Sequence, residues 1–153
     1  MNLSFQDTSE FSDEVIGELA AKVVAIDPWL RLGFTQGELH YRTSHPECGS
    51  RHLVIVDDGK PAGLICLKHP WLYGVYIGLF AILPEAQGKG VGSSALEFIE
   101  REYRDKVKNI WLLVSDFNEQ AKAFYQSRGF KTIGTIDDFL VEGEDEVLMR
   151  KVL

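Results

Sequence analysis

The spacing of apolar residues changes along the chain, and the first third has the spacing of helices. After Ser12, apolar residues recur three and four positions apart: Val15, Ile16, Leu19, Ala20, Val23 and Val24. This pattern predicts an amphipathic helix with Ser12 as its N-cap, preceded by a short first strand. Asp27-Pro28 ends or redirects this helix, and Pro28 is well placed to begin a second, shorter one.

The middle of the chain has the pattern of β-strands. The stretch HLVIVDDGKPAGLICL contains two apolar runs around Asp58-Gly59, a dipeptide typical of tight hairpin turns. A third apolar run, VYIGLFAIL, ends at Pro84. We therefore expect a β-hairpin followed by a third strand.

Helices and strands alternate in the rest of the chain. A helix follows the glycine-rich stretch PEAQGKGVG and runs to about Asp105, and NIWLLVSD predicts a buried strand. The stretch NEQAKAFYQSRG predicts a helix capped by Asp116 or Asn118, with Gly129 just past its end. Two final strands are expected in FKTIGTIDDFL and EVLMRKVL. This order predicts one mixed α/β domain over residues 1–153, without a linker.

Composition and charge narrow the classes of function. Apolar residues make up 45% of the chain and charged residues 25%, which is ordinary for a soluble globular domain. The net charge of −7 argues against a nucleic-acid partner, because binding phosphates requires a basic face. No apolar run is long enough for a membrane span, and the first residues lack the features of a secretion signal. We therefore expect a cytoplasmic protein without a membrane partner.

Cysteine and histidine give no metal signal. Cys48 and Cys66 have neither metal-ligand spacing nor the pattern of a disulfide framework. The four histidines are scattered and form no HExxH or similar motif. We expect no metal site.

The glycine-rich stretch is the strongest chemical signal. Gly88, Gly90 and Gly92 stand directly before a helix whose apolar face contains Val91, Ala95, Phe98 and Ile99. Exposed amides and the positive end of the helix dipole attract anions, and Lys89 adds a full positive charge. The stretch therefore predicts a seat for a phosphate or pyrophosphate group.

Three other interpretations of the glycines compete with this one. The stretch could be only a glycine-rich turn into a helix. A P-loop is excluded because it requires GxxxxGK[ST], and Ser93-Ser94 does not directly follow a Gly-Lys pair. Residues 90–95 fit the GxGxxA pattern of dinucleotide-binding enzymes, with Asp116 at the end of the next strand. The residues PEAQGK, however, separate the strand from Gly90, and a dinucleotide turn follows its strand closely.

Two motifs in order resemble the GNAT acetyltransferase superfamily. The first is Gln87-Gly88-Lys89-Gly90-Val91-Gly92, which fits the pyrophosphate loop [QR]xxGx[GA]. The second is the set Asn118, Ala121, Phe124-Tyr125 and Gly129-Phe130. The order of elements matches along nearly the whole chain. The resemblance implies a mixed, mostly antiparallel sheet of six to seven strands flanked by about four helices.

The resemblance also implies how acetyl-CoA is held. Backbone amides of the loop would bind its pyrophosphate, and the pantetheine arm would pair with the main chain near Ile82. Asn118 matches the family position that contacts the cofactor arm, although it could also be a simple helix cap. The loop residues are Gln87, Gly88, Lys89, Gly90, Val91, Gly92 and Ser93.

Two catalytic groups follow from the same resemblance. The backbone N–H of Phe80 matches the donor that stabilises the oxyanion formed during acyl transfer, an effect worth about 3–4 kcal/mol in other enzymes. Tyr125 matches the general acid that protonates the leaving thiolate, and a phenol with a pKa near 10 remains protonated at neutral pH. The alternative for Tyr125 is a core aromatic, since Ala121, Phe124 and Tyr125 form an apolar stripe.

The general base is missing from its usual places. Many relatives have a glutamate on the central strand or on the strand before the second motif, where this chain has Tyr76 and Leu113. Proton removal relayed by water is the alternative. The candidates for it are His69, Tyr73, Tyr76 and Asp116.

The resemblance implies that the acceptor site lies between the early helices and the last strand pair. Trp29, Trp71 and Tyr73 could form an aromatic wall there, with Tyr76 beside it. An acidic group could attract a cationic acceptor: Glu142, Glu144, Asp145 and Glu146. The alternatives are that the aromatic residues cap the core and that the acids solvate a loop.

The resemblance therefore implies an N-acetyltransferase that moves an acetyl group from acetyl-CoA directly to a primary amine of a small molecule or peptide. The alternatives are a coenzyme A-binding domain without catalysis and, more remotely, a nicotinamide-dependent enzyme. No cysteine is placed as an acyl carrier, although Cys66 lies on a predicted strand. Edge strands of this fold often pair, which would give a homodimer.

Overall fold

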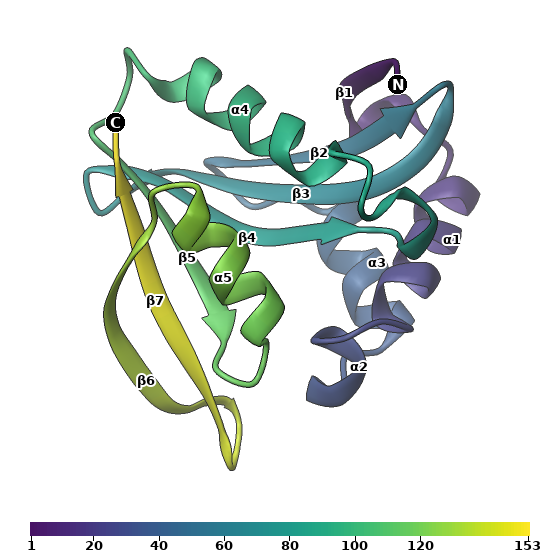
Figure 1. Cartoon of the computed structure of the whole chain (residues 1–153). Helices are drawn as coiled ribbons and strands as arrows, with labels where there is room; N and C mark the ends of the chain where they lie inside the picture. The colour runs from purple at the N-terminus through teal and green to yellow at the C-terminus, as the bar shows by residue number, and fades with distance from the viewer.

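One seven-stranded sheet runs through the computed structural model, which describes residues 1–153 (Figure 1). The strand order is β1-β2-β3-β4-β5-β7-β6, and only β4 and β5 are parallel neighbours. The expected mixed, mostly antiparallel sheet is therefore confirmed. The strands are β1 Leu3–Asp7, β2 Ser50–Asp57, β3 Lys60–Trp71, β4 Gly74–Ile82, β5 Asn109–Ser115, β6 Lys131–Val141 and β7 Glu144–Val152.

Helices cover both faces of the sheet. Figure 1 shows α1, α2 and α3 on one face and α4 and α5 on the other. Alternate residues of β2 explain this layering, because Leu53 and Ile55 pack with α4 whereas Val54 and Val56 pack with α1. The helices are α1 Asp13–Val24, α2 Trp29–Leu32, α3 Gln36–Ser44, α4 Val91–Tyr103 and α5 Glu119–Ser127.

Caps and turns have the conformations that the sequence predicts. The Ser12 hydroxyl caps α1 by accepting an amide of its first turn. Asp58 and Gly59 have φ angles of 48° and 79°, which is the two-residue turn that suits the twist of the β2–β3 hairpin. The second helical segment is divided in two, because the left-handed Gly33 ends α2 and Thr35 caps α3.

The central strands β4 and β5 separate along their length. Parallel pairing joins Gly74–Ile77 to Asn109–Leu112 and extends no further. Gly78 has no partner in β3 and forms a β-bulge, which bends β4. Figure 1 shows the two strands starting together and then pointing apart. Residues Gly78–Ile82 of β4 and Leu113–Ser115 of β5 are therefore not paired with each other, and we call this unpaired stretch the β4–β5 opening.

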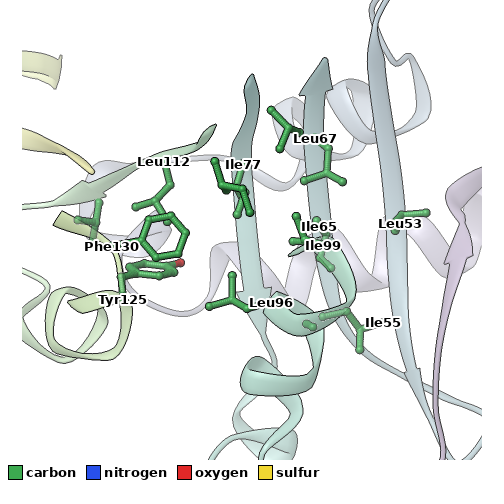
Figure 2. Close-up of a cluster of buried hydrophobic side chains, with 14 of the residues drawn as sticks. Leu53, Ile55, Ile65, Leu67, Ile77, Leu96, Ile99, Leu112, Tyr125 and Phe130 are labelled. Atoms are coloured by element: carbon green, nitrogen blue, oxygen red, sulfur yellow. The ribbon is translucent and has the colours of Figure 1, made fainter. Parts of the chain in front are cut away.

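The main core fixes the positions of α4 and α5. Leu96 of α4 packs beside Ile77, and Tyr125 and Phe130 close the core near Leu112 (Figure 2). Complete burial of one aliphatic side chain of this kind contributes about 1.5–3 kcal/mol. The helix ends beside the β4–β5 opening are therefore held by the core. None of the helices combines the length and apolar character needed to cross a bilayer.

Candidate active site

The loop between β4 and α4 owes two of its glycines to backbone conformation. Gly88 and Gly90 have φ angles of 71° and 84°, in the left-handed region that favours glycine. A Cβ atom at either position would meet nothing within 4 Å, so the surrounding space is open. Gly92 lies in the first turn of α4, and a Cβ atom there would be 3.5 Å from Phe124 and 3.7 Å from Ile82.

A run of backbone amides in this loop has no partner in the protein. The amides of Ala86, Gln87 and Ser94 bond to carbonyl oxygens at 2.9, 3.2 and 3.0 Å. The amides of residues 88–93, in contrast, donate to no group of the chain. They surround the N-terminus of α4, where the positive end of the helix dipole adds to their effect. This arrangement can bind an anion such as a pyrophosphate.

Side chains of the loop hold its shape. Gln87 Nε2 donates to the carbonyl of Ile82 at 2.8 Å, which ties the loop to the end of β4. Lys89 Nζ donates to the carbonyl of Glu85 at 2.7 Å, so its positive charge lies over the loop. Of these two residues, Gln87 supports the loop and Lys89 supplies charge.

Arg128 is a cation near the loop that the sequence analysis did not identify. It follows α5, and its guanidinium donates to the Ser93 hydroxyl in the first turn of α4. It also lies 3.8 Å from a carboxylate oxygen of Glu97. Only the packing of α5 against α4 brings Arg128 to this place, although its position directly before Gly129 in the second motif was a usable signal.

The backbone of β4 presents polar groups to the β4–β5 opening. The amide of Leu83 donates to Ala62 at 2.9 Å, on the β3 side. Successive residues of a strand direct their backbone groups to opposite edges, so Ile82 and Phe80 direct theirs toward the opening. Pairing with β5 ends at Ile77, so this edge has no strand partner beyond it, and the Ile82 carbonyl accepts from Gln87 Nε2 instead. Both backbone positions expected to contact the cofactor thus face the same space.

Tyr125 lies beside this space, at the edge of the core. Its ring makes edge contacts with Phe80, Phe124 and Phe130, at centroid distances of 6.3, 5.4 and 5.6 Å. Figure 2 shows its hydroxyl oxygen directed away from α5, toward the side of β4. No protein group hydrogen-bonds this hydroxyl, and the residue is 8% exposed. Burial raises the pKa of the Tyr125 phenol well above its usual value, so it retains its proton at neutral pH.

Asn118, rather than Asp116, is the N-cap of α5. Its Oδ1 accepts the amide of Ala121 at 3.1 Å. Asp116 forms an ion pair with Lys122 at 2.9 Å instead. The cap fixes the start of the helix that carries Tyr125.

Two of the water-relay candidates lie away from the β4–β5 opening. His69 contacts Tyr103 at the far end of α4, and the thirteen-residue length of this helix separates it from the glycine loop by roughly 18 Å. Tyr73 is 91% exposed in the β3–β4 turn. Neither position suits proton removal at the opening.

The two titratable side chains nearest the middle of β4 are poor nucleophiles or bases. Burial raises the pKa of the Tyr76 phenol. The positive charge of Arg42 lowers this pKa, and the negative charge of Glu146 raises it. Burial also raises the pKa of the Cys66 thiol to about 12. Both groups stay protonated at neutral pH, so Tyr76 is not a ready base and Cys66 is not an acyl carrier.

The aromatic wall of Trp29, Trp71 and Tyr73 does not form. Trp71 instead stacks on Tyr76, with ring centroids 4.7 Å apart, and meets Trp111 edge-on at 5.9 Å. Trp29 packs against the core below α1, and no aromatic contact joins it to Trp71. Spacing in the sequence could not reveal this, because the contacts depend on pairing between β3, β4 and β5.

A hollow of about 590 Å³ adjoins Trp71 and Tyr76 on the face that α3 covers. Arg42 of α3 lines it and reaches over Gly78, where a Cβ atom would lie 3.2 Å from the guanidinium. The hollow therefore borders β4 at its bulge. The hollow lies on the face of β4 opposite to Tyr125. One face therefore has the buried Tyr125 phenol, and the other has the hollow lined by Arg42.

Comparison with known proteins supports one family. The model of the acetyltransferase (GNAT) family matches residues 16–130. An uncharacterised N-acetyltransferase of Methanocaldococcus jannaschii is 30% identical over 115 residues, which are 74% of this chain and 71% of that protein. The S-(2-succino)cysteine N-acetyltransferase of Bacillus subtilis is 32% identical over 109 residues, 65% of each protein.

A solved structure shows the same fold with the cofactor present. The PaiA N-acetyltransferase of Thermoplasma acidophilum, in complex with coenzyme A, superposes with a TM-score of 0.72 at 22% identity, covering all of both chains. The family match over residues 16–130 and the N-acetyltransferase relatives lead to one conclusion, with which the loop of unpaired amides agrees. The chain belongs to the GNAT family and is an acetyl-CoA-dependent N-acetyltransferase.

Proposed function

We propose that this enzyme binds acetyl-CoA along the glycine loop and the β4–β5 opening and transfers the acetyl group directly to a primary amine within a ternary complex. The observation that carries the proposal is the run of six unpaired amides, residues 88–93, at the N-terminus of α4. The free edge of β4 at Ile82 and Phe80 continues this run toward Tyr125. Backbone donors for the pyrophosphate, for the pantetheine arm and for the acetyl carbonyl thus lie in this order from the loop toward Tyr125.

Four groups of the protein have distinct roles in the proposed reaction. Acetyl-CoA supplies an acetyl group that is activated as a thioester. The Phe80 N–H donates a hydrogen bond to the carbonyl oxygen on which negative charge develops. The Tyr125 hydroxyl holds the proton that the departing sulfur needs, and its buried position keeps that proton in place until then. Lys89 and Arg128 add positive charge near the loop amides.

The acceptor reaches the opening from the face that carries α3. That face has the hollow beside Trp71 and Tyr76, and Arg42 places a cation at its rim. The Bacillus subtilis relative is named for an amino acid derivative that carries several carboxylates. We therefore favour a small-molecule amine with an anionic group over a polyamine.

Substitution of the general acid tests the proposal. We expect Tyr125→Phe to lower kcat by about 100-fold or more, in the range typical for loss of a general acid, and to change the Kd for coenzyme A by less than about twofold. The phenyl ring keeps the core contacts, so the fold should be retained. Free thiol release from acetyl-CoA measures turnover, and calorimetry measures binding. A suitable amine panel contains S-(2-succino)cysteine, glutamate, spermidine, glucosamine and a lysine peptide.

Tyr103→Phe is the matched control, because Tyr103 lies in the same core at the opposite end of α4. It should leave turnover and binding unchanged. Undiminished turnover in Tyr125→Phe would contradict the role of the phenol. Failure of the wild-type protein to bind coenzyme A would contradict the whole proposal.

A further inference from the structure

A buried carboxylate on β7 lies next to the β4–β5 opening and has no cation as partner. Glu146 is 3% exposed and pairs with Ser115, the last residue of β5. The Ser115 hydroxyl donates to Glu146 Oε1 at 2.7 Å, and this is the only hydrogen bond to its side chain. The sparsely exposed Glu100, in comparison, forms an ion pair with Lys151 at 2.5 Å. Glu146 is thus a carboxylate taken out of water without a compensating charge.

The face of the sheet places this carboxylate on the acceptor side. Val147 and Met149 of β7 are in the core beneath α5, so Glu146 projects from the opposite face. Tyr76 lies on that same face of β4, where it stacks on Trp71. The negative charge of Glu146 raises the pKa of the Tyr76 phenol. Glu146 and Tyr125 therefore flank the β4–β5 opening from opposite faces.

Burial raises the pKa of the Glu146 carboxyl above its usual value. The hydrogen bond from Ser115 lowers this pKa, and the negative charge of Glu144 raises it. The groups around it are few. Glu144 on its own strand is paired with Arg31 of α2, and Asp116 beyond β5 is paired with Lys122. On the same face, β4 presents the Tyr76 phenol, and α3 places Arg42 over Gly78, where its charge acts on Tyr76. The β6 residue paired with Glu146 is Ile136.

A purely structural role explains this residue poorly. A buried carboxylate without a cation costs free energy because its solvation is lost. Glutamine would accept the Ser115 hydrogen bond without that loss. A cost of this kind at the edge of an opening is typical of a functional group.

We propose that Glu146 is the general base of this enzyme: its carboxylate binds the acceptor's ammonium group and receives its proton. The proposal rests on the acetyl transfer proposed above and supplies the carboxylate that is absent at Tyr76 and Leu113. Ser115 is a positioning residue, because it orients one carboxylate oxygen and leaves the other for the amine.

Glu146 takes one proton from the ammonium group, and the freed nitrogen lone pair forms the bond to the carbonyl carbon. The carbon–sulfur bond breaks, its electron pair stays on sulfur, and Tyr125 protonates that sulfur. The nitrogen loses a second proton as the amide forms, which restores the Tyr125 hydroxyl. One proton leaves Glu146 for solvent in each turnover, so nothing else is consumed.

Glu146→Gln with a pH series tests this role. An ammonium group is mostly protonated at neutral pH, and without a base only its neutral fraction reacts. We expect kcat/KM of the variant to be about 100-fold below wild type at pH 7, measured with the panel amine that wild type acetylates fastest. The deficit should shrink by about tenfold per pH unit as the pH approaches the pKa of that amine. A constant deficit, or none, would overturn the proposal.

Asp137→Asn is the control, because it removes an exposed carboxylate from the same hairpin. It should leave the pH profile unchanged. Coenzyme A binding should be normal in both variants. If the proposed function is wrong, the wild-type protein itself will lack binding or turnover, whereas an error in the role of Glu146 leaves both intact.

Thermal stability gives a readout that needs no acceptor. A carboxyl whose pKa is raised by folding stabilises the fold below its unfolded-state pKa, and this stability is lost as pH rises through the folded-state value. Glu146→Gln should therefore raise Tm relative to wild type at pH 8 more than at pH 4.5. An equal shift at both values would show that Glu146 carries no buried charge and would overturn the proposal.

Discussion

Burial has opposite consequences for the proposed general acid, Tyr125, and the proposed general base, Glu146. Removal from water disfavours the charged form of both side chains, so the pKa of Tyr125 and that of Glu146 are both raised. The phenol becomes more firmly protonated, which suits a group that must arrive with its proton. The carboxylate becomes a stronger base, which suits a group that must take one. The same physical cause thus prepares two different roles.

The raised pKa of Tyr125 makes a prediction about alkaline pH. Its acid role requires the protonated phenol, and burial moves loss of that proton well above pH 10. We expect kcat at saturating substrates to stay constant, within about twofold, from pH 8 to pH 10. Stopped assays of thiol release at each pH measure this. A decline with an apparent pKa near 9 would mean that a more exposed group supplies the proton.

At the scale of elements, the site depends on where regular structure ends. β4 stops pairing with β5 at Ile77, and this opens one strand edge. α4 begins at Val91 after the left-handed Gly90, and this frees its first amides. Strand edge and helix terminus are the two places where backbone donors lack partners. In the proposed complex, these two sets of donors together hold the anionic cofactor, although the loop itself has few charged residues.

Gly90→Ala tests the contribution of the loop conformation. An alanine at a φ of 84° costs about 1–2 kcal/mol, because its Cβ disfavours the left-handed region even where space is open. The loop should relax away from its present shape, so we expect the Kd for coenzyme A to rise by about 5–30-fold. Gly37→Ala is the matched control. Gly37 lies inside α3 with open space around it, so alanine there should stabilise the fold by about 0.5–1 kcal/mol and leave Kd unchanged.

The helices, the strands and the glycine loop could be predicted because the sequence patterns that determine them are local. The period of apolar residues, the caps at Ser12 and Asn118 and the turn at Asp58 all lie within a few residues of the structure they determine. The base was not predictable in this way. Glu146 is significant only because β7 pairs with β5 and aligns it with Ser115, a contact between residues 31 positions apart. The stacking of Trp71 on Tyr76 was missed for the same reason.

At the scale of the molecule, the acceptor side is bounded by segments from both ends of the chain. Arg31 of α2 meets Glu144 of β7, with its Nε and an Nη atom each 2.9 Å from one carboxylate oxygen. The guanidinium also lies 4.0 Å from the centroid of the Phe117 ring. These contacts join the helical face to the β6–β7 hairpin, which carries Glu146.

Arg31→Ala tests whether this connection positions the acceptor site. The pair is half exposed, so its loss should reduce the free energy of unfolding by no more than about 1 kcal/mol. If the connection holds the hairpin beside the opening, the acceptor KM should rise severalfold while the Kd for coenzyme A stays the same, because the glycine loop lies on other elements. Arg51→Ala is the control, since it breaks the comparably exposed pair with Glu102 on the α4 side. Equal acceptor KM values in the two variants would mean that the hairpin keeps its place without Arg31, and that the β5–β7 ladder alone positions Glu146.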